Sequence, residues 1–132
     1  MDRKQAQIAV IDDDESVRRA IRRLFVSSGL HAEGFATGRA FLDSLSASRP
    51  DCIVLDLQMP GLNGIDVMNA LTRTGLAVPV VIVTGHDEPE SRERCLAAGA
   101  RAYLCKPFDD AALLQVVGEA VDAASGPAAR IG

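Results

Sequence analysis

Four short runs of the chain are apolar at consecutive positions, and this pattern constrains the fold more than any other feature. The runs are Ile8–Ile11, Cys52–Leu55, Val80–Val83 and Ala102–Cys105. Strands that are buried on both faces have this pattern, as in a parallel sheet covered by helices, whereas half-exposed strands alternate. A less apolar segment, His31–Phe35, suits a strand at the edge of the same sheet.

Segments with helical spacing of apolar residues follow each run, and most have a start signal. We expect the helices to begin at capping residues, which are Asp14 or Glu15, Thr37, Asp87 and Asp109. Because strand and helix alternate along the chain, the sequence predicts an α/β domain of the flavodoxin-like, doubly wound (βα)5 type. Its five-stranded parallel sheet is expected in the order 2-1-3-4-5.

Size and composition limit what this domain can be. The 132 residues allow one domain, expected at 1–124, with a flexible tail or the start of a linker at 125–132. A net charge of −4 argues against a nucleic-acid-binding surface. No apolar stretch approaches the roughly 20 residues of a membrane helix, so we expect a cytoplasmic protein. Cys52, Cys95 and Cys105 form no C-x-x-C pair and are expected to be buried thiols.

Polar side chains directly follow four of the strand candidates. They are Asp12, Asp13 and Asp14 after the first run, Asp56 after the second, Thr84 after the third and Lys106 after the fourth. Taken alone, the aspartates and Thr84 could be helix caps or turn residues, and Lys106 by itself indicates little. The carboxyl ends of parallel strands meet at one edge, where α/β domains place their sites. Because four strand ends carry reactive polar groups, the sequence predicts a functional site at this edge of the sheet.

The carboxylates at this edge indicate metal and phosphoryl chemistry. Asp12 and Asp13 beside Asp56 need a cation or a shared proton to offset their charge, and carboxylate oxygens with a backbone carbonyl suit Mg²⁺. Asp56 would be a nucleophile toward phosphorus. Lys106 and the Thr84 hydroxyl would contact the phosphoryl oxygens. The chain has neither a P-loop nor a G-x-G-x-x-G motif, which weakens a nucleotide-binding hypothesis.

Five motifs in order resemble the receiver domain of two-component response regulators, over about Gln7–Val121. They are VIDDD at Val10–Asp14, LDLQMPGLNG at Leu55–Gly64, VTGH at Val83–His86, GARAYL at Gly99–Leu104 and CKPF at Cys105–Phe108. Each motif is weak alone, and the ordered set is highly specific. The third and the last motif further resemble the FixJ-like group, whose receivers are usually fused to a helix-turn-helix DNA-binding domain.

The resemblance implies a role for each residue of the edge. Asp56 would be the phosphoacceptor, receiving a phosphoryl group from a phosphohistidine of a sensor histidine kinase. Asp13 would bind Mg²⁺ directly together with Asp56, Gln58 would add its backbone carbonyl, and Asp12 would act through water. Lys106 would contact the phosphoryl group.

The resemblance also implies a switch. Thr84 would move toward the phosphate and the ring of Tyr103 would move inward, although Tyr103 could also be a simple packed aromatic. Gln58 and His86 lie where the family tunes the loss of the phosphoryl group, and His86 could equally be a plain loop residue. The Lys106–Pro107 bond is expected to be cis.

The sequence therefore predicts a phosphorylation-dependent signalling switch that turns over no external substrate. It would change its partner-binding surface, a homodimer being one outcome, and would meet DNA only through an output domain absent from this chain. Whether it is a stand-alone regulator or half of a transcription factor stays open.

Two alternatives remain for the function. A phosphohydrolase or phosphotransferase of the haloacid dehalogenase type would need a second acid at the position of Gln58. A phosphate-independent interaction module would not need the complete set of acidic and basic residues.

Overall fold

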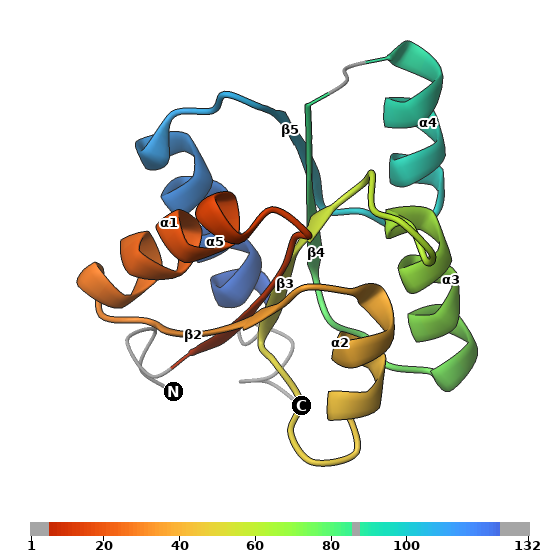
Figure 1. Ribbon diagram of the computed structural model, residues 1–132, viewed down its shortest axis with the longest axis horizontal. Helices are drawn as coiled ribbons and strands as arrows, with labels where there is room; N and C mark the ends of the chain where they lie inside the picture. Colours follow the sequence, from red (N-terminus) through yellow and green to blue (C-terminus); the bar gives the residue numbers. More distant parts are fainter. Residues whose placement is uncertain (1–5, 86–87, 125–132) are drawn as a thin grey trace.

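The computed structural model describes residues 6–85 and 88–124. Within them a five-stranded parallel sheet has the order β2-β1-β3-β4-β5, as the sequence predicts (Figure 1). The strands are β1 (Gln7–Ile11), β2 (His31–Phe35), β3 (Cys52–Asp56), β4 (Val80–Thr84) and β5 (Ala102–Cys105). The helices are α1 (Glu15–Ser27), α2 (Gly38–Ser44), α3 (Gly64–Thr74), α4 (Pro89–Ala97) and α5 (Asp110–Ala124).

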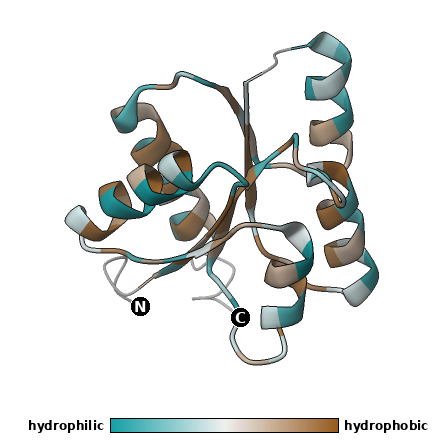
Figure 2. Cartoon of the chain, viewed as in Figure 1, coloured by the Kyte–Doolittle hydropathy of each residue, from teal (hydrophilic) through white to brown (hydrophobic). Residues whose placement is uncertain are grey.

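Helices cover both faces of the sheet, with α1 and α5 on one side and α2, α3 and α4 on the other (Figure 1). Along β1, Ile8 and Val10 pack with Phe25 of α1, whereas Ala9 and Ile11 belong to the core on the opposite face. Successive strand residues point to opposite faces, so both sets must be apolar. This explains the continuous apolar runs, which appear as hydrophobic central strands in Figure 2.

Side-chain caps fix the beginnings of several helices. Asp14 accepts hydrogen bonds from the backbone N–H groups of Ser16 and Val17, and Thr37 accepts one from Ala40, as predicted. The start of α3 has a capping box between Asn63 and Asp66, which the sequence analysis missed.

The predicted start of α4 is less accurate. This helix begins at Pro89 with Glu88 at its N-cap, one position later than expected, and Glu88 makes no side-chain capping bond. The missing N–H of proline costs nothing at a first helical position, so Pro89 suits this start. Asp87, the expected cap, lies outside the described residues, as do His86 and the tail 125–132. No helix among residues 6–85 and 88–124 is long and apolar enough to cross a bilayer.

The three cysteines are free thiols. Cys52 and Cys95 are buried as predicted, and burial raises the pKa of the Cys52 thiol to about 12. The prediction was wrong for Cys105, which is only partly buried. The reason is its place on β5, which lies at an edge of the sheet and is less covered than the central strands.

Candidate functional site

The polar residues that follow the strands lie at one edge of the sheet. Asp56 and Thr84 are the last residues of β3 and β4, and Asp12 and Lys106 directly follow β1 and β5. The strand register aligns these ends side by side, since Ile11 pairs with Leu55 and Thr84 pairs with Cys105. The backbone N–H of Lys106 donates to the Thr84 carbonyl at 2.7 Å, which extends the pairing beyond the strands.

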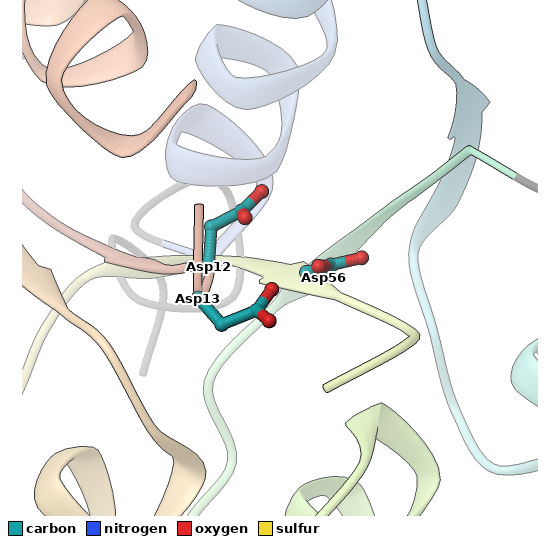
Figure 3. A group of neighbouring side chains, drawn as sticks. All are labelled: Asp12, Asp13 and Asp56. Atoms are coloured by element: carbon teal, nitrogen blue, oxygen red, sulfur yellow. The ribbon is translucent and has the colours of Figure 1, made fainter. Parts of the chain in front are cut away.

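Three carboxylates form the centre of this edge. Asp12 and Asp13 come from the end of β1 and Asp56 from the end of β3 (Figure 3). One oxygen of each lies within 4.8 Å of the others. Asp12 and Asp56 are buried, whereas Asp13 is exposed. Buried like charges at this separation repel unless a cation or a proton offsets them, so the cluster has the chemistry of a site for a hard divalent cation.

Lys106 brings one positive charge to the cluster. Its Nζ lies 2.9 Å from Asp12 Oδ2 and 3.8 Å from Asp56 Oδ1, so Asp12 is the hydrogen-bonded partner. The other oxygen of Asp12 accepts the backbone N–H of Asp14 at 2.9 Å. Both oxygens of Asp12 are therefore engaged within the protein. One ammonium facing three carboxylates leaves the edge with an excess of negative charge.

Asp56 has an unusual protonation equilibrium. Burial raises the pKa of its carboxyl to about 6, and the charges of Asp12 and Asp13 add to the rise. The Lys106 ammonium and the Gln58 N–H, which donates to Asp56 Oδ1 at 3.2 Å, oppose it. The ionised carboxylate is thus destabilised in the metal-free protein, and a bound cation would relieve that cost.

This shift predicts how stability depends on pH in the presence of a chelator. Folded Asp56 stays protonated up to about pH 6, whereas the unfolded group ionises near the ordinary pKa of an aspartate, 3.8. The folded state therefore binds the extra proton, and its stability falls as pH rises through this interval. Asp56→Asn removes the effect, so we expect the variant to be more stable than the wild type by about 1–3 kcal/mol near pH 7.5.

Urea unfolding of both proteins in EDTA, at about pH 4.5 and pH 7.5, tests this expectation. The stability difference between them should widen toward the higher pH, because only the wild type has the titrating group. Carboxylates that do not interact with Asp56 affect both proteins alike and cancel in the difference. A pH-independent difference would show that the Asp56 pKa is not raised.

Thr84 and Tyr103 lie on adjacent strands and on the same face of the sheet. Tyr103 pairs in register with Ile82, and Thr84 is two positions further along β4. Residues two apart in a strand share a face, so Thr84 is a diagonal neighbour of Tyr103. Both are buried, and the guanidinium of Arg92 on α4 lies 5.1 Å from the centre of the Tyr103 ring. A movement of Thr84 could therefore reach the ring and α4.

Two further residues named in the sequence analysis lie at this edge. Gln58 is exposed in the loop that follows Asp56, and the Lys106–Pro107 peptide bond is cis, as expected.

Sequence reasoning missed some residues that position the edge. Arg18 on α1 donates from Nη1 to the Asp12 carbonyl at 2.7 Å, which anchors the backbone of the acidic segment. Gly64 lies so close to the chain after β3 that an added Cβ would stand 2.9 Å from Leu57 Cα and 3.1 Å from the Asp56 carbonyl oxygen. The capping signal at Asn63 was visible in the sequence, whereas the contacts of Arg18 and Gly64 had no local signal.

The fold and the edge together define a class of protein: an α/β domain with a carboxylate cluster and a lysine at the carboxyl ends of its parallel strands. The family model of the response regulator receiver domain matches residues 8–118. The chain belongs to this family, a family of signalling domains in two-component systems.

Curated relatives and solved structures agree with this assignment. Nodulation protein W of Bradyrhizobium diazoefficiens is 37% identical over 113 residues, which are 86% of this chain and 50% of that protein. The transcriptional regulatory protein FixJ of Azorhizobium caulinodans is 37% identical over 110 residues, covering 83% of this chain and 52% of that protein. The chain thus spans about half the length of these relatives.

Solved structures of similar proteins have the same architecture. A response regulator receiver protein from Burkholderia phymatum is 51% identical with a TM-score of 0.79, covering 89% of this chain and 95% of that one. Full-length FixJ from B. japonicum is 34% identical with a TM-score of 0.87, covering 95% of this chain and 61% of that one.

Proposed function

We propose that this domain switches its state when Asp56 accepts a phosphoryl group from a phosphohistidine of a sensor histidine kinase. The observation that carries the proposal is the setting of Asp56, a buried carboxylate at a strand end with a Lys106 ammonium 3.8 Å away. An Asp56 oxygen would bond to phosphorus as the bond between phosphorus and the imidazole nitrogen breaks. The domain would modify itself without turning over an external substrate.

The donor set supports Mg²⁺ as the cation of this edge. Asp13 and Asp56 would bind it directly, together with the backbone carbonyl of Gln58. Asp12 would act through water, since Lys106 and the Asp14 N–H already engage its two oxygens. When bound, the ion offsets negative charge on the carboxylates and on the incoming phosphoryl oxygens.

Lys106 and Thr84 would hold the transferred group and report its presence. Lys106 would hydrogen-bond a phosphoryl oxygen, which draws its ammonium away from Asp12. The Thr84 hydroxyl would bond a second phosphoryl oxygen. Because Tyr103 is the diagonal neighbour of Thr84 and packs under Arg92, this movement would be transmitted to β5 and α4. The surface of α4 and β5 would then gain or lose a partner, a second copy of the domain included.

An apolar hollow beside Lys106 supports docking of the phosphoryl donor there. The hollow has a volume of about 460 Å³ and lies between α1 and the segment after β5, lined by Val17, Ala20, Ile21, Leu24, Lys106, Pro107, Phe108 and Asp110. A helix of a kinase could bury an apolar face in it and present its phosphohistidine to Asp56. Contact with DNA would require an output domain.

The alternatives have less support. Gln58 occupies the position where a dehalogenase-type phosphohydrolase has its second acid, so no general acid follows the nucleophile. A phosphate-independent interaction module would have no need for a buried carboxylate with a raised pKa at a strand end.

Intact-protein mass spectrometry after incubation with acetyl phosphate tests the proposal. With Mg²⁺ we expect a gain of about 80 Da, the mass of one phosphoryl group, and in EDTA we expect none. The ion is needed because three carboxylates would otherwise repel the anionic donor. A gain that is equally large in EDTA would contradict the metal assignment, and no gain in either condition would contradict acceptance from a small donor.

A further inference from the structure

A second hollow lies between α2 and α3, far from the phosphoacceptor. It has a volume of about 710 Å³, and its lining includes Arg39, Leu42, Asp43, Leu45, Arg49, Arg73 and Leu76. The helices lie side by side on one face of the sheet (Figure 1). They run antiparallel to the strands, so their last turns lie at the edge opposite to Asp56. We call this hollow the α2–α3 groove.

The charge of the groove is opposite to that of the chain. Three arginines from separate segments line it against one acid, Asp43, although the net charge of the chain is −4. Arg39, Arg49 and Arg73 are exposed, and within residues 6–85 and 88–124 none of them has an acidic ion-pair partner. Positive charge therefore exceeds negative charge in the groove, with three arginines against one aspartate.

These arginines are not needed to cap the helices that they flank. At the end of α3 the Leu71 carbonyl accepts from the Thr74 hydroxyl at 2.8 Å and from the Leu76 N–H at 3.2 Å. At the end of α2 the Ser44 carbonyl accepts the N–H groups of Ala47 and Ser48. Helix ends satisfied in this way leave the guanidinium groups available for an external anion.

The floor of the groove is apolar. Leu42, Leu45 and Leu76 are half-buried and pack against the core under α2 and α3, with their remaining surface in the groove. An apolar floor with a cationic rim matches a ligand that has aliphatic side chains flanked by carboxylates. No aromatic residue lines the groove, so it lacks the stacking platform that single-stranded nucleic acids use.

We propose that the α2–α3 groove binds an acidic segment of a partner protein with leucine-like side chains between its carboxylates. The site is separate from the phosphorylation edge and shares no residue with it.

The test uses a short fluorescein-labelled peptide of Leu and Glu and measures its binding to the full chain by fluorescence anisotropy. Neutralising the rim with Arg39→Gln, Arg49→Gln and Arg73→Gln should weaken binding roughly tenfold or more, because three charge pairs are lost. The control variant carries Arg19→Gln, Arg23→Gln and Arg101→Gln, which removes the same charge elsewhere and should bind like the wild type. Amide chemical shifts should change at 42–49 and 70–76.

Several outcomes would overturn the proposal. They are no binding by the wild type, equal loss in both variants, or equal binding of a peptide of Glu and Ser that lacks the apolar side chains. Tighter binding of single-stranded DNA in the groove would assign it to nucleic acid instead. Circular dichroism of both variants checks that they are folded. Labelling of Asp56 by acetyl phosphate should be unchanged in the groove variant, so this test and that of the proposed function fail independently.

Discussion

Asp56→Asn is expected to abolish the mass gain of about 80 Da that acetyl phosphate and Mg²⁺ produce in the wild type. The amide has nearly the shape of the carboxylate but no anionic oxygen to attack phosphorus. The fold should survive, because the carboxylate is destabilised by burial and by Asp12 and Asp13. A missing mass gain in the variant would therefore report the loss of the acceptor group and not a loss of folded protein.

The control for this variant is Asp43→Asn on α2. Asp43 is exposed at the opposite edge of the sheet, and its loss removes the same charge and the same atoms. It should label like the wild type. Undiminished labelling of Asp56→Asn would place the acceptor on another residue, and peptide mapping of the adduct would identify it.

Lys106→Ala is expected to leave Mg²⁺ binding largely in place and to weaken the conformational change that follows phosphorylation. Lys106 offers no metal ligand, whereas its ammonium would hold a phosphoryl oxygen. Hydrogen bonds to charged groups contribute about 1.5–3 kcal/mol, so the equilibrium between the two states should shift roughly 10- to 150-fold toward the unswitched one. The variant also leaves Asp12 without its hydrogen-bonded cation, which we expect to lower stability.

Amide chemical shifts of β5 and α4 measure this effect. In the wild type the chemical shifts around Tyr103 and Arg92 should change on phosphorylation. Thr84 would move toward the phosphoryl group, it is the diagonal neighbour of Tyr103, and the Tyr103 ring contacts Arg92. In Lys106→Ala most of that change should be lost, while the Mg²⁺ affinity stays within a few-fold of the wild type. Arg101→Ala, an exposed change next to β5, is the matched control and should switch normally. A full shift change in Lys106→Ala would remove this residue from the switching mechanism.

Much of the fold could be predicted because its signals are local. The consecutive apolar residues of β3 and β4 indicate strands that are buried on both faces. The mixed composition of His31–Phe35 indicates a strand at the edge of the sheet. Capping residues such as Asp14 and Thr37 act within one turn of their helices. The start of α4 was misjudged because two acidic residues precede Pro89 and either could occupy the cap.

The membership of the site could also be predicted, since parallel strands carry their last residues to one edge. The sequence did not determine which of those side chains pair with one another. Lys106 stands closer to Asp12 than to Asp56, a choice between partners 94 and 50 positions away in the chain. The contact of Arg92 with Tyr103 and the arginine rim of the α2–α3 groove likewise join separate segments.

The sequence by itself determined the class of fold and the edge where the reactive groups meet, because periodicity, caps and strand ends depend on neighbouring residues. The strand order was predicted from the common arrangement of doubly wound domains. The tertiary structure alone decided the pairing of Lys106, the raised pKa of Asp56 and the excess of positive charge between α2 and α3. Coulomb energies and desolvation depend on distances and burial, and these exist only once segments far apart in the chain have packed together.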